Sequence, residues 1–373
     1  MSKKRVAVIF GGQSSEHEVS RVSAQSVIEN IDKQKYDIVM IGITKDGQWL
    51  TYDGPAEKIG TGEWQAIAQQ KFLAQKQETA AETTEIAANN SARGILAETK
   101  APIDVIFPVL HGCNGEDGTI QGLFELAQIP YVGCGVLASS LGMDKAYTKI
   151  IFEKEGLPQG GYLVFNRKQI YYENDSVIKE VESRLAYPCF VKPSNAGSSV
   201  GVNKASNRDE LKIALDIAAK NDRRILVEEF INGREIECAV LGNDNPIAST
   251  VGEVVPCNDF YDYEAKYQVG DSSRVVIPAE NLAPETIEKI RAYAVRAFKC
   301  LDCAGLSRVD FFVHKETGDV YINEINTLPG FTQISMYPKL WAQSGISYNK
   351  LIDKLIELAF ERYEDCKREY TNS

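Results

Sequence analysis

The order of apolar and polar positions divides the chain into two parts. In the first part, an apolar run at Arg5–Phe10 is followed by an amphipathic segment through Ile31 and a second apolar run at Tyr36–Ile43. A strand, a helix and a strand in this order predict a parallel sheet with helices on its faces. Ile103–Leu110 continues the pattern as a further strand. We therefore expect an α/β domain up to about residue 142, with Ser14 or Ser15 as the cap of its first helix.

The second part begins at about Met143 and has a different pattern. Apolar runs come in pairs joined by Gly-rich turns, which is typical of antiparallel strands and an α+β fold. We expect strands at Cys189–Pro193, Val200–Ala205, Arg224–Phe230, Ile236–Leu241 and Ile247–Val255, and helices at Ile287–Phe298 and from Tyr348 to about Tyr363. Residues 57–100 are rich in Ala, Gln, Glu and Thr, and we interpret them as a variable surface insertion, in the form of a helix or a mobile excursion.

A hairpin near the C-terminus is the most informative stretch. The runs Ser307–His314 and Val320–Asn326 flank a short turn. If the hairpin is symmetric about Thr317, Asp310 lies directly opposite Glu324, and two like charges at that spacing are destabilising. We therefore expect a cation between the two carboxylates.

The same face of this hairpin carries Arg308 and Asn326, because side chains alternate faces along a strand. Carboxylate and amide oxygens suit Mg²⁺, which usually takes one or two carboxylates together with phosphate oxygens. The sequence therefore indicates a magnesium site. The alternative is a solvated polar face in which Arg308 is an internal counter-ion.

Composition narrows the range of partners. The 373 residues are 44% hydrophobic and 25% charged, as in an ordinary globular protein of two or three domains. The net charge of −11 argues against nucleic acid or an anionic membrane as a partner. The chain has no apolar run of about 18 residues that could span a membrane. Its eight scattered cysteines suit a reducing cytosol, so we expect a cytoplasmic protein.

Two weaker motifs are not favoured. The turn Gly11–Ser15 follows a strand but lacks the spaced glycines of a dinucleotide-binding loop, and no matching acid follows the second strand. Cys300–Cys303 is a single CxxC without a second pair at zinc spacing. Small buried thiols are the better interpretation of these cysteines.

A loop of small residues, Pro193–Gly201, follows Lys192 at the end of a strand. Consecutive N–H groups and Ser hydroxyls can converge on an anion there, and Lys192 can place a charge on a phosphate. The loop does not end in the GK[ST] of a P-loop, and a flexible hairpin is the alternative. In Leu226–Ile236, acids next to a turn can accept hydrogen bonds from a ribose, while main-chain groups contact an adenine edge.

Together these segments resemble the ATP-grasp carboxylate–amine ligases and, within them, the D-alanine–D-alanine ligase family. The resemblance covers nearly the whole chain and is carried by Gly11–Ser20, His111–Gly112, Gly115–Gly118, Gly142–Lys145, Lys192–Gly201, Phe260–Tyr267, Arg308–Asp310 and Asn323–Gly330. It implies a Rossmann-like N-terminal substrate domain (1–142), a central ATP-grasp subdomain (143–235) and a C-terminal subdomain with the metal and second-substrate sites (236–373). ATP is expected between the last two.

The resemblance also implies a role for each matching residue. For the nucleotide and metal, Lys145 and Lys192 would contact phosphates, Glu228, Glu229 and Ile231 the adenine, Glu235 the ribose, and Asp310, Glu324 and Asn326 two Mg²⁺ ions, with Mn²⁺ as a substitute. For the substrates, Glu16 and His111 would hold the first D-alanine, and Ser335 would hold the second. Arg308 and the Gly330 N–H would stabilise the oxyanion. Ser198 and Tyr267 would belong to a loop that closes over Glu16.

The activity implied is the ATP-dependent joining of two D-alanines through D-alanyl phosphate, for synthesis of peptidoglycan precursors. Positioning and charge neutralisation suffice for phosphoryl transfer, so no enzyme nucleophile is required. Two alternatives stay open: D-lactate or D-serine as the second substrate, and a non-catalytic ATP-binding module. Tyr267 favours D-alanine, because a neutral phenol tolerates an incoming ammonium group. The resemblance further implies a homodimer.

Overall fold

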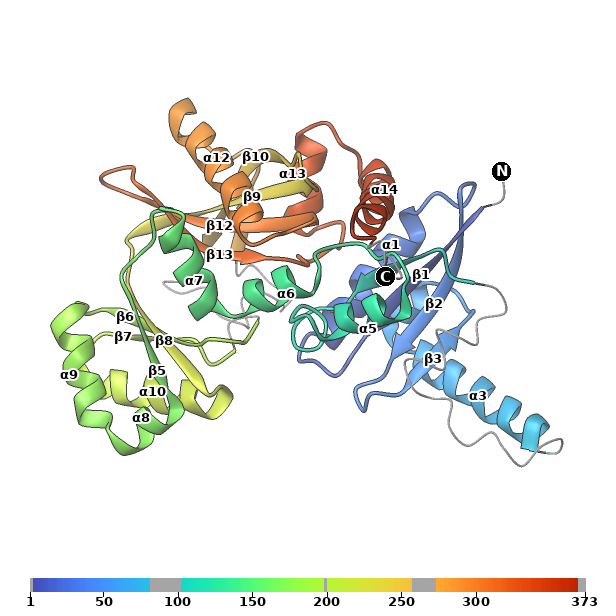
Figure 1. The fold of residues 1–373 in the computed structure, drawn as a ribbon, viewed down its shortest axis with the longest axis horizontal. Coiled ribbons are helices and arrows are strands. Elements are labelled where there is room, and N and C mark those ends of the chain that lie inside the picture. Colours follow the sequence, from blue (N-terminus) through green and yellow to red (C-terminus); the bar gives the residue numbers. More distant parts are fainter. Residues whose placement is uncertain (1–2, 81–101, 198–199, 257–272, 368–373) are drawn as a thin grey trace, which may run out of the picture.

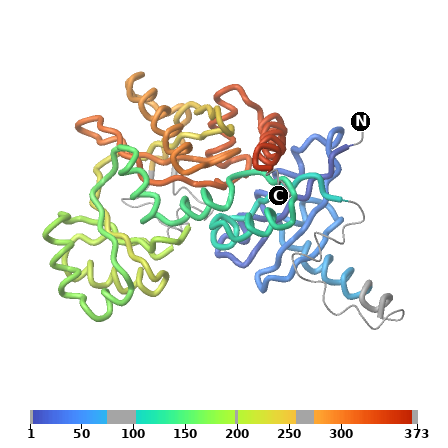
Figure 2. The backbone as a smooth tube through the Cα atoms, in the orientation of Figure 1, coloured from blue at the N-terminus to red at the C-terminus, as the bar shows by residue number. Residues whose placement is uncertain are grey.

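The structure is a computed structural model that describes residues 3–80, 102–197, 200–256 and 273–367. The helices and strands form three groups, each built around one sheet, and the N-terminal group lies at one end of the molecule (Figure 1). Helices α6 (Val136–Met143) and α7 (Lys145–Lys154) lead from the N-terminal group to the other two, as the chain path in Figure 2 shows. No helix of the described residues is long and apolar enough to cross a membrane.

The N-terminal sheet has the strand order β3-β2-β1-β4. Strand β1 (Lys4–Gly11) runs parallel to β2 (Tyr36–Ile43) and to β4 (Val105–Val109), which confirms the expected parallel arrangement. Strand β3 (Trp49–Tyr52), which the sequence pattern did not predict, is antiparallel to β2. Alternate residues of β1 pack on opposite faces of the sheet, against α1 (His17–Asn30) on one side and α5 (Thr119–Ala127) on the other.

Residues 57–80 are helical, which was one of the two forms expected for this segment, but the segment is not wholly a surface insertion, because Ile59, Trp64 and Ala68 are buried in the core. They fold as α2 (Glu57–Thr61) and α3 (Trp64–Ala80). The side chain of Trp64 is fully buried, and its ring meets that of Phe10 edge to face with a centroid distance of 4.9 Å. An indole in a segment of otherwise polar composition thus completes one face of the sheet. The remaining residues of the predicted insertion lie outside the described residues.

The central sheet is antiparallel, as predicted, with the order β5-β8-β6-β7. Its strands and helices are β5 (Tyr162–Asn166), β6 (Cys189–Pro193), β7 (Asn203–Ala205), β8 (Arg224–Glu229), α8 (Arg167–Tyr172), α9 (Asn174–Arg184) and α10 (Arg208–Asn221). Apolar side chains of the helices and the sheet make a core of their own.

The C-terminal sheet is also antiparallel, with the order β11-β10-β9-β12-β13. Its elements are β9 (Gly233–Gly242), β10 (Ile247–Pro256), β11 (Ser273–Val276), β12 (Gly305–His314), β13 (Val320–Asn326), α12 (Pro284–Cys300), α13 (Met336–Gln343) and α14 (Tyr348–Asp365). Helix α12 packs on one face. Trp341 of α13 and Leu355 of α14 share a core with Val8 and Phe107 of the N-terminal sheet. The first and last parts of the chain are therefore held together by one apolar cluster.

The predicted pairing in the hairpin β12–β13 is confirmed. Asp310 lies opposite Glu324, and Arg308 lies opposite Asn326. The hairpin is not symmetric about its turn, however, because the register shifts by one residue after Asp310, which leaves Asn323 as a bulge. A bulged residue is released from regular pairing, so its side chain can be aimed at a neighbouring element.

Gly42 allows β2 to approach the indole of Trp64. A Cβ atom at Gly42 would lie 2.2 Å from ring atom Cζ3 of Trp64, so Gly42→Ala must displace a fully buried ring. We expect the free energy of unfolding in urea to fall by about 1–3 kcal/mol. Gly122→Ala in α5 is the control, since nothing lies within 4 Å of the added methyl group. Equal stability of the two variants would contradict the packing assigned to Trp64.

Candidate active site

One cleft of about 1600 Å³ is lined by residues from all three parts of the chain. Among the sequence-predicted site residues, those that line it are Glu16, His111, Lys145, Lys192, Glu228, Glu229, Ile231, Glu235, Arg308, Glu324, Asn326, Gly330 and Ser335. Asp310 is 2% exposed and lies beneath Arg308 rather than on the cleft surface. Ser198 and Tyr267 lie outside the described residues. The fold thus gathers positions that are more than 300 residues apart in sequence.

Arg308 stands between two acids in the C-terminal sheet. Its guanidinium donates two hydrogen bonds of 2.7 Å to Asp310, and its Nε lies 3.0 Å from Oε2 of Glu237. Glu237 is the partner of Asp310 on β9, on the side away from Glu324. Burial lowers the pKa of the guanidinium, but Asp310 and Glu237 raise it well above its ordinary value. Arg308 is therefore a fixed cation, as its proposed role in stabilising charge requires.

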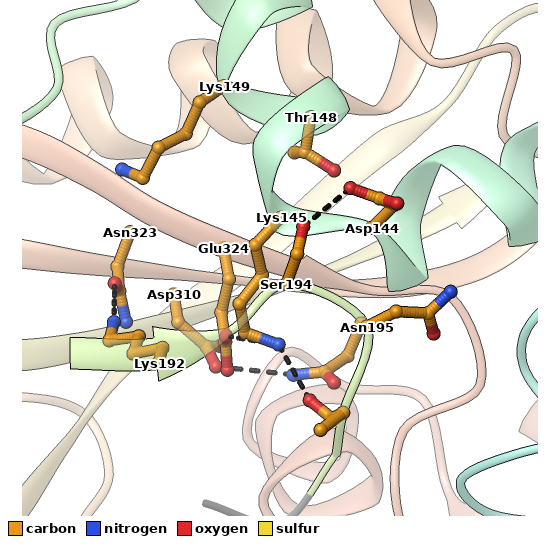
Figure 3. A network of polar contacts seen from close by, with 12 residues as sticks. Asp144, Lys145, Thr148, Lys149, Lys192, Ser194, Asn195, Asp310, Asn323 and Glu324 are labelled. Carbon is orange, nitrogen blue, oxygen red and sulfur yellow. Dashed lines mark hydrogen bonds and ion pairs between the residues drawn. The ribbon is translucent and has the colours of Figure 1, made fainter. Parts of the chain in front are cut away.

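Lys145 supplies a second cation to this face. Its ammonium group lies 3.6 Å from Oε2 of Glu324 and donates a hydrogen bond of 2.9 Å to the carbonyl oxygen of Ala196 (Figure 3). Asp310 and Glu324 are thus each paired with a cation, so their mutual repulsion is offset even without a metal ion. Asn326 donates a hydrogen bond of 3.3 Å to Asp310.

The donor chemistry of this face fits Mg²⁺, since Asp310, Glu324 and Asn326 offer oxygen ligands on adjacent strands. Among the described residues, however, no three His, Cys, Asp or Glu side chains are grouped so that they could hold a metal ion by themselves. Asn326 and phosphate oxygens of a nucleotide would have to complete the ligand set. This agrees with the preference of Mg²⁺ for shared protein and phosphate ligands.

The start of the small-residue loop is fixed to the start of α7. Asp144 is the N-cap of this helix, and the hydroxyl of Ser194 donates a hydrogen bond of 2.7 Å to it (Figure 3). The same hydroxyl accepts a hydrogen bond of 3.1 Å from the N–H of Ala146, and Arg224 forms an ion pair with Asp144. The cleft therefore has a rigid junction where Lys145 meets the loop.

Glu228 lies between two lysines. Its Oε1 is 2.6 Å from the ammonium group of Lys149, and its Oε2 is 2.6 Å from that of Lys192. Burial alone raises the pKa of the Glu228 carboxyl, but the two cations outweigh it and lower the pKa to about 2. The carboxylate is consequently charged at all physiological pH values. The Lys192 ammonium also contacts Oδ1 of the bulged Asn323 at 3.5 Å.

The turn between β8 and β9 forms one end of the cleft. Glu229 is largely exposed and its N–H donates a hydrogen bond of 3.0 Å to Gly161. A Cβ atom at Gly160 would lie 3.1 Å from Cδ1 of Ile231 and 3.3 Å from the Glu229 carboxylate, so the absence of a side chain at Gly160 lets these segments approach. Glu235 follows on β9, paired with Phe312 of β12. Ile231 and Glu235 both line the cleft, and their contacts to a base and a sugar stay predictions.

Glu16 and His111 meet at the opposite end, at the carboxyl ends of β1 and β4. The residue at the N-cap of α1 is Glu16, not Ser14 or Ser15, so the predicted cap is wrong. Ser14 instead accepts a hydrogen bond of 3.0 Å from the Glu16 N–H and donates one of 2.7 Å to the His111 carbonyl oxygen. These bonds join the loops that follow β1 and β4. Ligands of parallel sheets bind at this edge.

The ring of His111 is buried and contacted on both nitrogens. Nδ1 lies 3.2 Å from the carbonyl oxygen of Leu328 and 3.6 Å from Oε1 of Glu116, and Nε2 lies 3.2 Å from the hydroxyl of Ser23. Burial lowers the pKa of the imidazole, but the carboxylates of Glu116 and Glu16 outweigh it and raise the pKa. His111 therefore retains a proton to higher pH than a free histidine.

The third region of the cleft is a turn before α13. Ser335 accepts a hydrogen bond of 3.0 Å from the N–H of Thr332, and the two hydroxyls are 2.7 Å apart. A Cβ atom at Gly330 would lie 3.2 Å from the Ser335 hydroxyl. Gly330 and Ser335 are thus neighbours, as their predicted roles at one reacting centre require.

Sequence reasoning gave no role to several polar residues of this cleft, among them Glu116, Lys149, Glu237 and Asn323. Two had a local signal. Glu237 follows Glu235 by two positions on a strand, which predicts a shared face, and Lys149 follows Lys145 by one helical turn. Glu116 was part of a recognised motif but received no role. The bulge at Asn323 had no signal in the sequence pattern.

Two antiparallel sheets beside a cleft lined with lysines and acids, next to a parallel-sheet unit, define the ATP-grasp class of ligases. Family models described as "D-ala D-ala ligase N-terminus" and "D-ala D-ala ligase C-terminus" match residues 5–134 and 151–357. The chain belongs to the D-alanine–D-alanine ligase family, whose members are ATP-dependent ligases.

Individual relatives agree with this assignment. The D-alanine–D-alanine ligase of Ruminiclostridium cellulolyticum is 80% identical over 100% of both chains, and that of Acetivibrio thermocellus is 63% identical over 99% of both. Among solved structures, the VanG D-Ala:D-Ser ligase from Enterococcus faecalis has a TM-score of 0.81 and 40% identity, covering 96% of this chain and 100% of that one. The Coxiella burnetii D-alanine–D-alanine ligase has a TM-score of 0.78 and 34% identity, covering 98% and 96%.

The electrostatics of His111 can be measured directly, because the chain has only three histidines. In an NMR titration, we expect His111 to titrate above the ordinary histidine value and His17 below it, since burial lowers the pKa of His17. Glu116→Gln should lower the pKa of His111, because it removes the nearer carboxylate and leaves the ring buried. An unchanged His111 titration in this variant would rule out the His111–Glu116 pair.

Proposed function

We propose that this protein joins two D-alanine molecules to D-alanyl-D-alanine, converting ATP to ADP and phosphate, in the synthesis of peptidoglycan precursors. The observation that carries this proposal is a cleft in which Lys145, Lys192, Arg308 and Glu324 meet the Glu16–His111 loops, with Asp310 held beneath Arg308. The two relatives with 80% and 63% identity are D-alanine–D-alanine ligases, which supports it.

The charged residues of the cleft suit a ligation in two steps. A carboxylate resists attack by an amine until it is activated, so the first D-alanine takes the γ-phosphoryl group of ATP to give D-alanyl phosphate. Lys145 and Lys192 neutralise phosphate charge during this transfer, and Glu16 with His111 orients the ammonium group of the first D-alanine. The second amine then attacks the acyl carbon. Arg308 and the Gly330 N–H stabilise the tetrahedral oxyanion, which expels phosphate.

The nucleotide requires a divalent cation as a partner. Asp310, Glu324 and Asn326 would hold Mg²⁺, which supplies charge neutralisation on the phosphate oxygens when bound. Arg308 stays bonded to Asp310 and turns its remaining donors to the reacting centre. Lys145 exchanges Glu324 for a phosphate, since an ammonium group can follow the nearest anion.

D-serine is the second candidate for the amine substrate. The similarity to VanG D-Ala:D-Ser ligase favours it, whereas the two more identical relatives favour D-alanine. The division into domains at 142 and 235, the number of Mg²⁺ ions and the homodimer stay predictions of the family resemblance, and the cytoplasmic location stays a prediction from the cysteines.

Product analysis tests the proposed activity. Wild-type protein with ATP, Mg²⁺ and equal amounts of D-alanine, D-serine and D-lactate should release ADP and form mainly D-alanyl-D-alanine. Without D-alanine, ADP release should fall to background, because no carboxylate accepts the phosphoryl group. D-alanyl-D-serine as the main product would favour the second candidate, and ADP release independent of D-alanine would overturn the ligase assignment.

Glu324→Gln tests the metal site. The amide keeps the shape of the side chain but removes one ligand charge, so we expect kcat to fall about 100-fold. The rise in melting temperature that Mg²⁺ and ATP give together should shrink, since the stabilisation by a ligand falls as its dissociation constant rises. Glu316→Gln, on the exposed turn of the same hairpin, is the control and should behave as wild type. Full turnover by Glu324→Gln would remove Glu324 from the metal site.

A further inference from the structure

Lys149 is a buried lysine of the cleft whose charge is not used in the mechanism above. Its side chain is 3% exposed and reaches from α7 to Glu228 on β8, where the ammonium group makes an ion pair of 2.6 Å. A buried charge is retained in a protein only where it is closely paired. Lys149 therefore compensates the charge of Glu228, and its function depends on what Glu228 itself contacts.

Glu228 faces two ammonium groups that differ in their access to the cleft. Lys192 is 15% exposed and also contacts Asn323 of the metal-binding hairpin, whereas Lys149 is almost fully enclosed. Each takes one oxygen of the carboxylate at 2.6 Å. Together the three groups carry one excess positive charge. Lys192 is the member that can present this charge to a ligand.

Without Lys149 the group loses its excess positive charge. Glu228 would cancel the charge of Lys192, and both carboxylate oxygens would be free to hold its ammonium group. Lys192 would then offer little attraction to an anion. The environment is largely buried, so a change of one charge is screened less than on the protein surface and acts more strongly on a nearby phosphate.

We propose that Lys149 is a positioning residue for nucleotide binding, which neutralises Glu228 and so leaves the charge of Lys192 to the phosphate groups. The inference rests on the proposed function, because it assumes that the anion in this cleft belongs to a nucleotide. It assigns Glu228 a role in holding Lys192, in addition to any contact with the adenine.

A purely structural role is the competing explanation. Lys149 connects α7 to β8, its carbonyl oxygen accepts a hydrogen bond of 2.8 Å from Gln159, and its ammonium group lies 5.5 Å from the centre of the Tyr162 ring. If Lys149 only fastened these elements together, its loss would weaken the binding of every ligand in the cleft. The proposed role affects only ligands that carry phosphate.

The test compares ADP with adenosine, because the ratio of their dissociation constants isolates the phosphate contribution. Calorimetry at a fixed Mg²⁺ concentration would be applied to wild type, Lys149→Met, Glu228→Gln and the double variant. Lys149→Met should lower the adenosine-to-ADP ratio on the order of tenfold. Glu228→Gln should raise it, since both lysines lose their counter-ion. The double variant restores one excess charge and should recover most of the ratio lost in Lys149→Met.

Lys154→Met, on an exposed position of the same helix, is the matched control and should leave the ratio at the wild-type value. The role of Lys149 would be overturned if the adenosine-to-ADP ratio were the same in all folded variants. It would also be overturned if the ratio of the double variant were no higher than that of Lys149→Met. If Lys149→Met does not fold, the rise expected in Glu228→Gln decides the question. Wild-type protein that bound neither ADP nor adenosine would instead overturn the proposed nucleotide site.

Discussion

Opposed carboxylates on neighbouring strands destabilise a sheet unless cations pair with them, and the architecture of the cleft depends on this constraint. Arg308 separates Asp310 from Glu237, Lys145 pairs with Glu324, and two lysines share Glu228. Burying such charges is costly unless each is paired at close range. The alternation of acids and bases satisfies this condition, and it places Lys145, Lys192 and Arg308 along the cleft.

The cations come from elements that the fold must bring to one place. Helix α7 supplies Lys145 and Lys149 from one face, and its N-terminus is fixed to the small-residue loop through Asp144 and Ser194. The core that α13 and α14 share with the N-terminal sheet holds the Glu16–His111 loops at the far end of the same cleft. The position of the reactive groups therefore depends on packing far from them. Positioning of this kind can replace an enzyme nucleophile, because the acyl phosphate carries the activation.

Much of the fold could be predicted because it depends on local patterns. The parallel β-α-β opening, the paired antiparallel strands and the opposition of Asp310 and Glu324 follow from the period of apolar residues and from turn chemistry. The prediction of a surface insertion failed at a core residue that lies in a segment rich in Ala, Gln, Glu and Thr. Trp64 lies in a segment that resembles a surface insertion, yet it is fully buried between Phe10 and Gly42. Composition averages over a segment, whereas burial is decided by one side chain.

The sequence by itself determined which residue types face the cleft, because motifs place Lys192, Arg308 and Glu324 on strand ends and faces. Tertiary structure alone decided which charges pair. Glu237 reaches Arg308 through the neighbouring strand β9, Lys149 reaches Glu228 across two elements, and the bulge at Asn323 changes the register of the hairpin. Pairing energies depend on distance and burial. Neither quantity is a property of a residue or its neighbours in sequence, so both are fixed only when distant segments pack together.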